Sequence, residues 1–273
     1  MERLSVVIIT YNEERNLARC LESVLPVADE IVVLDSFSTD HTVEIAESYG
    51  AVVYQHKFLG YIAQKNKALS LATYNYVLSL DADEALDKTL QQSIIRVKKG
   101  GYAFKAYKMN RCANFCGKFI RYGAWYPEPK VRLFDRRVLN WGGLDPHDRI
   151  IVPATTAICP LKGDLLHYIC STVKELKLRN DNFSTIAARS LYRAGRRTNW
   201  LKILASPTWF FLNDLFIRRG ILNGYRGWQI AVNQARYHFF KYLKLYRLQK
   251  KPDFTVIKTS QATEKKPVSR ISS

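Results

Sequence analysis

The sequence lacks the glycine-rich patterns that mark two large classes of nucleotide-binding enzyme. Neither G-x-G-x-x-G nor G-x-x-x-x-G-K-[ST] follows the first predicted strand. In those classes the glycines let the backbone approach a phosphate group closely and turn into a helix. Their absence argues against a dinucleotide-dependent enzyme and against a P-loop NTPase. The sequence has no internal repeat either.

Cysteine is scarce, and its spacing indicates no zinc site. The 273 residues include five cysteines, of which only Cys112 and Cys116 are close in sequence. No second pair and no His-x-His completes a set of four ligands. Scattered cysteines in odd number predict reduced thiols, buried or half-buried, as in a cytosolic protein.

Long apolar segments are also missing. Met1–Arg3 leads directly into a strand, which leaves no room for the charged and apolar regions of a signal peptide. The most hydrophobic segment after the core strands is residues 206–219, which Pro207 and Asp214 interrupt. A membrane-spanning helix needs about 20 apolar residues, so this segment is too short to cross a bilayer.

Apolar side chains are nevertheless plentiful, and charge is distributed unevenly. Hydrophobic residues make up 47% of the chain, which excludes global disorder, and the net charge is +18. Residues 1–99 carry 10 Lys/Arg against 14 Asp/Glu, a net of −4, whereas residues 174–251 carry 17 against 3, a net of +14. This contrast predicts a site that holds a cation and a separate surface that meets polyanions.

Strands and helices alternate in the first half of the chain. Continuous β-branched runs predict strands covered on both faces, and short loops between them predict a right-handed, mostly parallel sheet. The predicted strands are residues 5–10, 30–35, 51–54, 76–80, 102–109 and 130–134, with loops at 112–125 and 141–148. From 171 to 248 the pattern is helical, and residues 251–273 form a polar tail that we expect to be disordered.

Polar and acidic residues follow three of these strands. They are Tyr11-Asn12-Glu13, Asp35 and Asp81-Ala82-Asp83. Ligands of open parallel sheets bind at the carboxyl ends of the strands, so the sheet gathers these residues in one crevice. One carboxylate of the Asp-x-Asp can ligate a hard cation while the other reaches a ribose. Mg²⁺ and Mn²⁺ favour such a site, with one or two carboxylates completed by phosphate oxygens.

These segments resemble the motifs of a known family. Residues 5–13, 31–42 and 78–84 are similar to three successive motifs of glycosyltransferase family 2. Gln64-Lys65-Asn66 and residues 129–134 fit the bacterial branch that adds a sugar to the lipopolysaccharide inner core. The resemblance covers roughly residues 4–250. It implies a GT-A fold, a UDP-sugar or other nucleotide-sugar donor, Mg²⁺ or Mn²⁺, and inversion at the anomeric carbon.

The resemblance also implies roles for single residues. Thr10, Tyr11 and Glu13 would border the nucleoside, and Asp35 would bind the uracil or ribose. Lys65 would lie near the donor phosphates, Asp83 would be the metal ligand, and Asp81 would face the ribose and a metal-bound water. The second motif departs from the pattern, because Asp35-Ser36-Phe37-Ser38 stands where many relatives have Asp-Asp-Gly-Ser.

Inversion needs a general base for the acceptor hydroxyl and positive charge on the leaving diphosphate. The best candidate for the base is Asp148, where the branch has a histidine followed by an acid, and Asp145 is its rival. His147 is a candidate metal or phosphate ligand, although a histidine that packs the loop would look the same. Arg132 and Arg136 are candidates for the leaving group.

Two further features allow two interpretations each. His167 lies in an apolar stretch and is a buried core histidine or a late phosphate-side ligand. The aromatic segment 115–125 forms part of an acceptor wall or part of the core.

The basic region predicts a surface for an anionic membrane. The aromatic side chains of residues 206–219 are flanked by basic residues, as in a helix that lies in a bilayer interface: Arg196, Arg197, Lys202, Arg218 and Arg219. This predicts a peripheral protein on the cytoplasmic face of a bacterial inner membrane, with a lipid-linked glycan acceptor. A basic helical cap on the catalytic domain is the alternative interpretation. A nucleic-acid-binding protein is a third interpretation, but the sequence contains no DNA- or RNA-binding motif, and that function would not explain the acidic cluster. A non-catalytic scaffold is a fourth, but it would not need the intact acids.

The sequence therefore predicts three regions. Residues 1–168 would form the GT-A domain that binds the nucleotide-sugar and carries out catalysis. Residues 169–250 would form a basic amphipathic helical region that associates with a membrane. Residues 251–273 would form the tail.

Overall fold

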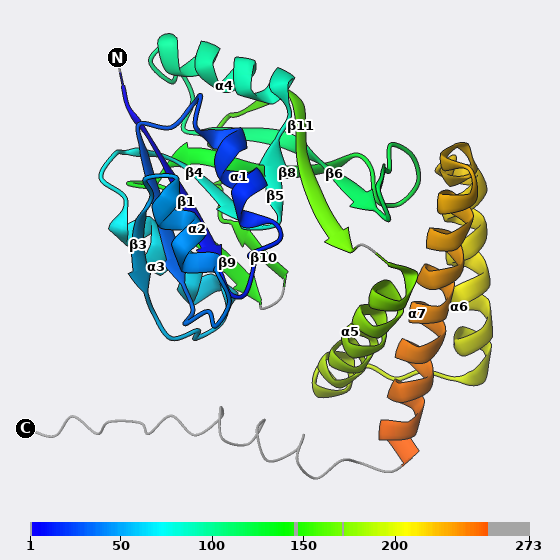
Figure 1. Ribbon diagram of the computed structural model, residues 1–273. Helices are drawn as coiled ribbons and strands as arrows, with labels where there is room; N and C mark the ends of the chain where they lie inside the picture. The colour runs from blue at the N-terminus through cyan, green and yellow to red at the C-terminus, as the bar shows by residue number, and fades with distance from the viewer. Residues whose placement is uncertain (1, 145–146, 171, 251–273) are drawn as a thin grey trace, which may run out of the picture. The chain divides into compact units, whose positions relative to one another are not determined.

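The computed structural model describes residues 2–144, 147–170 and 172–250, and for Leu144, His147 and Cys170 it describes the backbone alone. The chain divides into two compact units (Figure 1). The first comprises residues up to 121 and 125–169, and the second comprises 122–124 and the residues from 170 onward. Asp145, the rival base, and the tail 251–273 lie outside the described residues.

The first unit is an α/β structure. Its elements are, in chain order, β1 (Leu4–Thr10), α1 (Leu17–Val24), β2 (Glu30–Asp35), α2 (Thr42–Ser48), β3 (Val52–Gln55), α3 (Tyr61–Leu71), β4 (Tyr76–Asp81), β5 (Glu84–Leu86), α4 (Lys88–Lys99), β6 (Ala106–Phe115), β7 (Lys118–Phe119), β8 (Glu128–Asp135), β9 (Trp141–Leu144), β10 (His147–Ile150) and β11 (Ile158–Cys170).

One sheet runs through this unit in the order β3-β2-β1-β4-β8-β6-β11-β5. The first four strands are parallel, as the β-branched runs predict. Strand β8 then pairs antiparallel with β4 and β6, and β11 pairs antiparallel with β5. The register places Thr10 opposite Asp35 and Ile9 opposite Asp81. The polar ends of β1, β2 and β4 therefore meet at one edge of the sheet.

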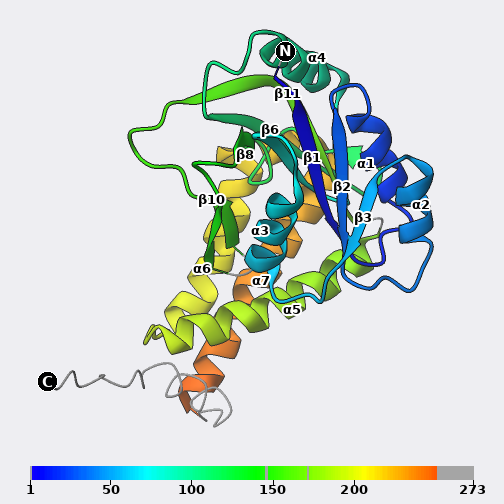
Figure 2. The ribbon, with the colours of Figure 1, turned by 90° about the vertical axis from the view of Figure 1, so that its left-hand side faces the viewer.

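Strand β1 has a core on both of its faces. Leu4, Val6 and Ile8 belong to a buried cluster with side chains of α1, α2 and α4. Val7 points the other way, into a second cluster with Ala68 of α3. Figure 2 shows α1 and α2 on one side of the parallel strands and α3 on the other. Burial of each large side chain contributes about 1.5–3 kcal/mol, which explains why this strand contains no charged residue.

The segment 141–148 was predicted to be an irregular loop, but its described residues belong to two paired strands. Strands β9 and β10 pair antiparallel, with Gly143 opposite Asp148 and Trp141 opposite Ile150. The glycines misled the prediction because they serve close packing as well as turns. A Cβ on Gly142 would lie 2.6 Å from the side chain of Ile151, and Gly143 has a φ of +105°. The predicted loop 112–125 also begins too early, since β6 continues to Phe115.

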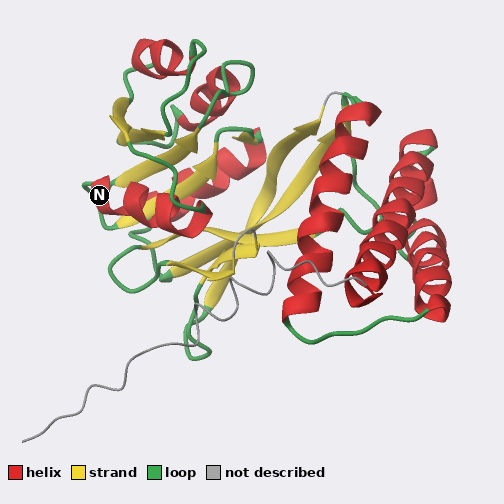
Figure 3. Ribbon diagram, turned by 90° about the horizontal axis from the view of Figure 1, so that it is seen from below, coloured by secondary structure: helices red, strands yellow, loops and turns green. Residues whose placement is uncertain are grey.

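The second unit is helical, as predicted. It contains α5 (Val173–Arg193), α6 (Trp200–Leu212), the π-helical turn η1 (Asn213–Ile217), the 3₁₀ turn η2 (Gly220–Asn223) and α7 (Tyr225–Lys250). Figure 3 shows these helices in red, and α7 packs against both α5 and α6. Thr172 and Glu175 form a capping box at the start of α5. None of the described helices has the length and hydrophobicity needed to cross a bilayer.

None of the four cysteines with described side chains forms a disulfide. Cys20 and Cys112 are buried, and Cys116 and Cys159 are half-buried, as predicted. Burial raises the pKa of the Cys112 thiol to about 11, so this side chain is an inert part of the core.

Candidate active site

The loops after β1 and β2 are joined by hydrogen bonds. The backbone N–H of Ser36 donates to the carbonyl of Thr10 (2.9 Å), and the N–H of Asn12 donates to the Ser38 hydroxyl (2.8 Å). The Asn12 side chain accepts in return from the N–H of Thr39 (2.8 Å). These bonds fix the two loops relative to each other, so the residues that they carry form one rigid rim.

The residues predicted to border the nucleoside differ in accessibility. Tyr11 is 59% exposed, whereas the Thr10 hydroxyl is buried and has no hydrogen-bond partner among the described residues. Burial raises the pKa of Glu13, whose carboxylate accepts from Asn16 (2.8 Å). Asp35 is fully buried, and its carboxylate accepts from the N–H and hydroxyl of Ser38 (2.9 and 2.5 Å). Asp35 thus holds the loop whatever else it binds.

Lys65 joins the Asp-x-Asp motif to the predicted base. Its side chain is almost completely buried on α3. The ammonium lies 2.9 Å from Asp81 Oδ1 and 2.7 Å from Asp148 Oδ2. Three residues from separate parts of the sequence are thereby brought into direct contact. Asp148 is half-buried, and Oδ2 is the oxygen that Lys65 occupies.

The neighbours of Lys65 along α3 anchor the helix to adjacent segments. Gln64 donates to the Ser36 hydroxyl (3.0 Å) in the loop after β2. Asn66 exchanges two hydrogen bonds with the backbone of Trp141, both 3.0 Å long. The triplet therefore fixes where the Lys65 ammonium lies.

Arg132 forms a second buried cationic contact behind Asp81. Its guanidinium lies 3.0 Å from Asp81 and 2.7 Å from Glu84, and only 3% of the residue is exposed. Burial alone would raise the pKa of Asp81, but Lys65 and Arg132 hold it well below its usual range. Burial would likewise lower the pKa of Arg132, but Glu84 and Asp81 raise it. Asp81 is thus a permanent carboxylate.

Two residues that the sequence reasoning missed complete this network. Glu84 is fully buried, and Trp141 lies beneath both cations, with its ring centre 4.3 Å from Lys65 Nζ and 5.0 Å from Arg132 Cζ. Arg111 adds a contact of 3.5 Å to Glu84. The position of Glu84 directly after the Asp-x-Asp motif was the available signal. Trp141 gave none, because its partners come from α3 and β8.

Asp83 and His167 are the residues best placed to hold a metal. His167 Nε2 on β11 lies 3.1 Å from Asp83 Oδ2, and Nδ1 of this buried ring has no partner among the described residues. In the described part of the chain no group of three or more His, Cys, Asp or Glu side chains could hold a metal. The Asp83 carboxylate fits Mg²⁺ or Mn²⁺ that takes its other ligands from phosphate and water. The His147 side chain lies outside the described residues.

The structure bears on two further predictions. Arg136 donates to the carbonyl of Tyr74 (2.8 Å), and its neighbour Asp135 pairs with Tyr76 at the start of β4. It therefore lies at the opposite end of the sheet from Asp81, and its assignment to the leaving group is wrong. In the aromatic segment, Phe115 belongs to the core, because it is fully buried and its ring contacts that of Trp125.

Comparison with known proteins identifies the family. The model of glycosyl transferase family 2 matches residues 5–146. The lipopolysaccharide core biosynthesis glycosyltransferase LpsC of Rhizobium meliloti is 31% identical, over 89% of this chain and 92% of LpsC. The chain belongs to glycosyltransferase family 2. The predicted family is confirmed, and with it the predicted α/β sheet of GT-A type flanked by helices.

Two solved structures are more distantly similar. The structure of S. aureus TarS 1-349 matches over 92% of each chain, with 16% identity and a TM-score of 0.44. Glucosyl-3-phosphoglycerate synthase from Mycobacterium tuberculosis, solved with Mn²⁺ and UDP, is 24% identical. The match covers 40% of this chain and 43% of the synthase, with a TM-score of 0.34.

Proposed function

We propose that this glycosyltransferase transfers a sugar with inversion from a UDP-sugar to a lipid-linked glycan, and that the acceptor is the lipopolysaccharide core. The observation that carries the proposal is the cluster of Asp81, Asp83, Lys65 and Asp148 at the carboxyl ends of the parallel strands. The similarity to LpsC supports the choice of acceptor.

The chemistry follows from the positions of these groups. The acceptor hydroxyl oxygen forms a bond to the anomeric carbon on the face opposite the diphosphate. The bond from that carbon to the diphosphate oxygen breaks, and its electron pair leaves with the diphosphate. Asp148 takes the hydroxyl proton on Oδ1, because Oδ2 accepts from Lys65. Lys65 keeps the base in place and supplies positive charge near the phosphates.

Asp83 is the proposed carboxylate ligand of Mg²⁺ or Mn²⁺, with His167 as its imidazole partner. His147, directly before Asp148 in β10, is the second candidate histidine. The metal would neutralise charge on the diphosphate. The Arg132 guanidinium is bound by Asp81 and Glu84. It acts through Asp81, which it holds ionised and oriented toward the ribose.

Calorimetry of UDP-sugar binding with and without Mn²⁺ tests the metal site. Asp83→Ala should abolish the Mn²⁺-dependent part of the affinity while the protein stays folded, because Mn²⁺ loses its carboxylate. His167→Ala and His147→Ala decide which imidazole contributes. Glu47→Ala, an exposed acid on α2, is the control and should bind like the wild type. If the affinity of Asp83→Ala for the UDP-sugar still depends on Mn²⁺ as in the wild type, Asp83 is not the metal ligand.

The second unit supplies the proposed membrane surface. Nine apolar side chains of α6, η1, η2 and α7 are more than half exposed: Trp200, Leu201, Leu204, Trp209, Phe216, Ile217, Ile221, Leu222 and Tyr225. Arg218 and Arg219 lie between η1 and η2. Apolar insertion combined with cationic attraction of about 1 kcal/mol per basic side chain is typical of helices that bind anionic bilayers.

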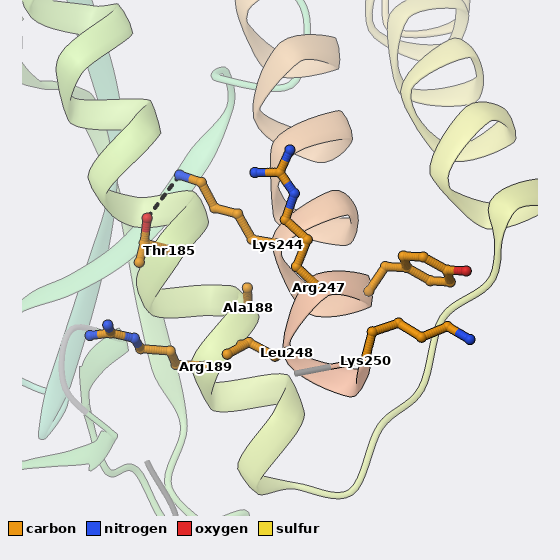
Figure 4. Close-up of a pocket in the computed structure, with 8 residues that line it drawn as sticks. Thr185, Ala188, Arg189, Lys244, Arg247, Leu248 and Lys250 are labelled. Carbon is orange, nitrogen blue, oxygen red and sulfur yellow. Dashed lines mark hydrogen bonds between the residues drawn. The ribbon is translucent and has the colours of Figure 1, made fainter. Parts of the chain in front are cut away.

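A basic pocket between α5 and α7 supports the same proposal. It has a volume of about 560 Å³, and Arg189, Lys244, Arg247 and Lys250 contribute to its lining (Figure 4). Lys244 is bound to Asp181 (2.9 Å) and to the Thr185 hydroxyl (2.8 Å). Residues 174–251 contain only three acids, so most basic residues there face an excess of positive charge. Anionic headgroups would reduce that repulsion. We propose a peripheral location on the cytoplasmic face of the inner membrane.

A further inference from the structure

Phe37 combines a strained backbone with an exposed ring. Its φ is +63°, in the left-handed region that a bulky side chain adopts at a cost and that glycine adopts freely. The residue is 54% exposed and belongs to neither buried cluster of the first unit. Its ring therefore does not offset the strain through burial in the core.

The surrounding loop would keep its shape without the ring. Ser36 donates its N–H to Thr10 and accepts from Gln64 through its hydroxyl, and Ser38 binds Asp35 through both its N–H and its hydroxyl. These bonds come from the neighbours of Phe37 and would hold a glycine in the same conformation. A strained aromatic side chain in such a loop indicates a role in binding.

The position of the loop indicates which part of a ligand the ring meets. Phe37 follows β2, and Tyr11, which is 59% exposed, follows the adjacent β1. Lys65, Asp81 and Asp83 lie at the end of β4, on the other side of β1. Strands two places apart are separated by roughly 10 Å, about the reach of a nucleotide from phosphate to base. With the diphosphate at β4, the base lies at β2.

We propose that Phe37 is a donor-binding residue that contacts the face of the nucleobase. The proposal rests on the proposed function, because it assumes a nucleoside diphosphate with its phosphates at Asp81 and Asp83. The ring offers a planar apolar surface in the loop next to the one that carries the exposed Tyr11, and stacking on aromatic rings is a general way to bind bases. A contact with the base would also explain why Phe37 stands where many relatives have the glycine of Asp-Asp-Gly-Ser.

Calorimetry with UDP and Mn²⁺ tests this assignment. Phe37→Gly and Phe37→Asn both remove the ring, and asparagine tolerates the left-handed backbone without the freedom of glycine. Both should raise the Kd of UDP about 5- to 100-fold, whereas Phe37→Tyr should bind like the wild type. The Tm of Phe37→Gly should not fall, because the strain is relieved. Inorganic diphosphate with Mn²⁺, which has no base, should bind all of these proteins equally.

Cys116→Gly is the matched control. Cys116 also has a left-handed backbone, with a φ of +49°, in the turn between β6 and β7, so this variant relieves similar strain without touching the loop after β2. Its Kd for UDP should not change. If Phe37→Gly and Phe37→Asn both bind UDP as the wild type does, the assignment is wrong. It is also wrong if only Phe37→Gly loses affinity for UDP, because the cause would then be the added flexibility of the loop. If the wild type binds neither UDP nor diphosphate, the proposed function fails as well.

Discussion

The two units of this chain use charge in opposite ways. In the first, Lys65 and Arg132 are almost completely buried, and each lies within 3.0 Å of two carboxylate side chains. In the second, cations far outnumber acids over residues 174–251, and apolar side chains of α6 and η1 are exposed.

This difference determines how much a single charge matters. A buried ion pair costs desolvation energy on both sides, so removing one partner leaves a charge that nothing compensates. An exposed cation is hydrated and screened, and it contributes through the sum of many weak attractions. One substitution should therefore disable the first unit, while the second should lose function in proportion to the number of charges removed.

The largest effect is expected for Arg132→Met. The variant leaves the buried Glu84 carboxylate with the 3.5 Å contact to Arg111 and the backbone N–H of Asp81, and it takes one of two cations from Asp81. The free energy of unfolding should fall by about 3–5 kcal/mol, the usual cost of breaking a buried pair. Urea denaturation followed by circular dichroism measures the change.

Lys130→Met is the control on the same strand. Lys130 pairs with Glu128 at 2.9 Å, and both side chains are about one third exposed. Its loss should cost roughly 0–1 kcal/mol. If the two variants unfold at the same urea concentration, the buried ion pair contributes no more to stability than the exposed one.

A smaller but still large effect is expected for Asp148→Asn, measured as turnover of a UDP-sugar. Asparagine can still accept a hydrogen bond from Lys65 but cannot take the acceptor proton. Turnover should fall about a hundredfold or more, with little change in the Kd of the donor. Asp145→Asn is the matched comparison. If Asp145→Asn shows this loss and Asp148→Asn does not, the base is Asp145.

The smallest effect per residue is expected in the second unit. Changing Arg218 and Arg219 to Gln should weaken binding to anionic vesicles by about 2 kcal/mol, roughly 30-fold, and leave UDP binding unchanged. Changing the exposed Lys88 and Lys99 of α4 to Gln alters the net charge equally and should have no such effect. Flotation with vesicles at low salt measures both. A wild type that stays with the soluble fraction would make the second unit a basic helical cap.

The parts of this protein that depend on local pattern were predictable. Residues 5–10 and 30–35 were identified as strands because runs of β-branched side chains suit a strand covered on both faces. The acidic motif at 81–83 followed from its place at a strand end. The pairing of β9 with β10 was missed, because Gly142 serves a close approach to Ile151 that only the folded chain reveals.

The sequence by itself determined the family, the parallel strands, the acidic strand ends and the basic helical region, since each depends on residues that are close together in the sequence. Only the tertiary structure decided the partners: that Lys65 lies between Asp81 and Asp148, that Arg132 is buried behind the motif while Arg136 lies at the far end of the sheet, and that His167 meets Asp83. These contacts join residues 16 to 84 positions apart. Their geometry depends on strand order and register, which local side-chain preferences do not encode.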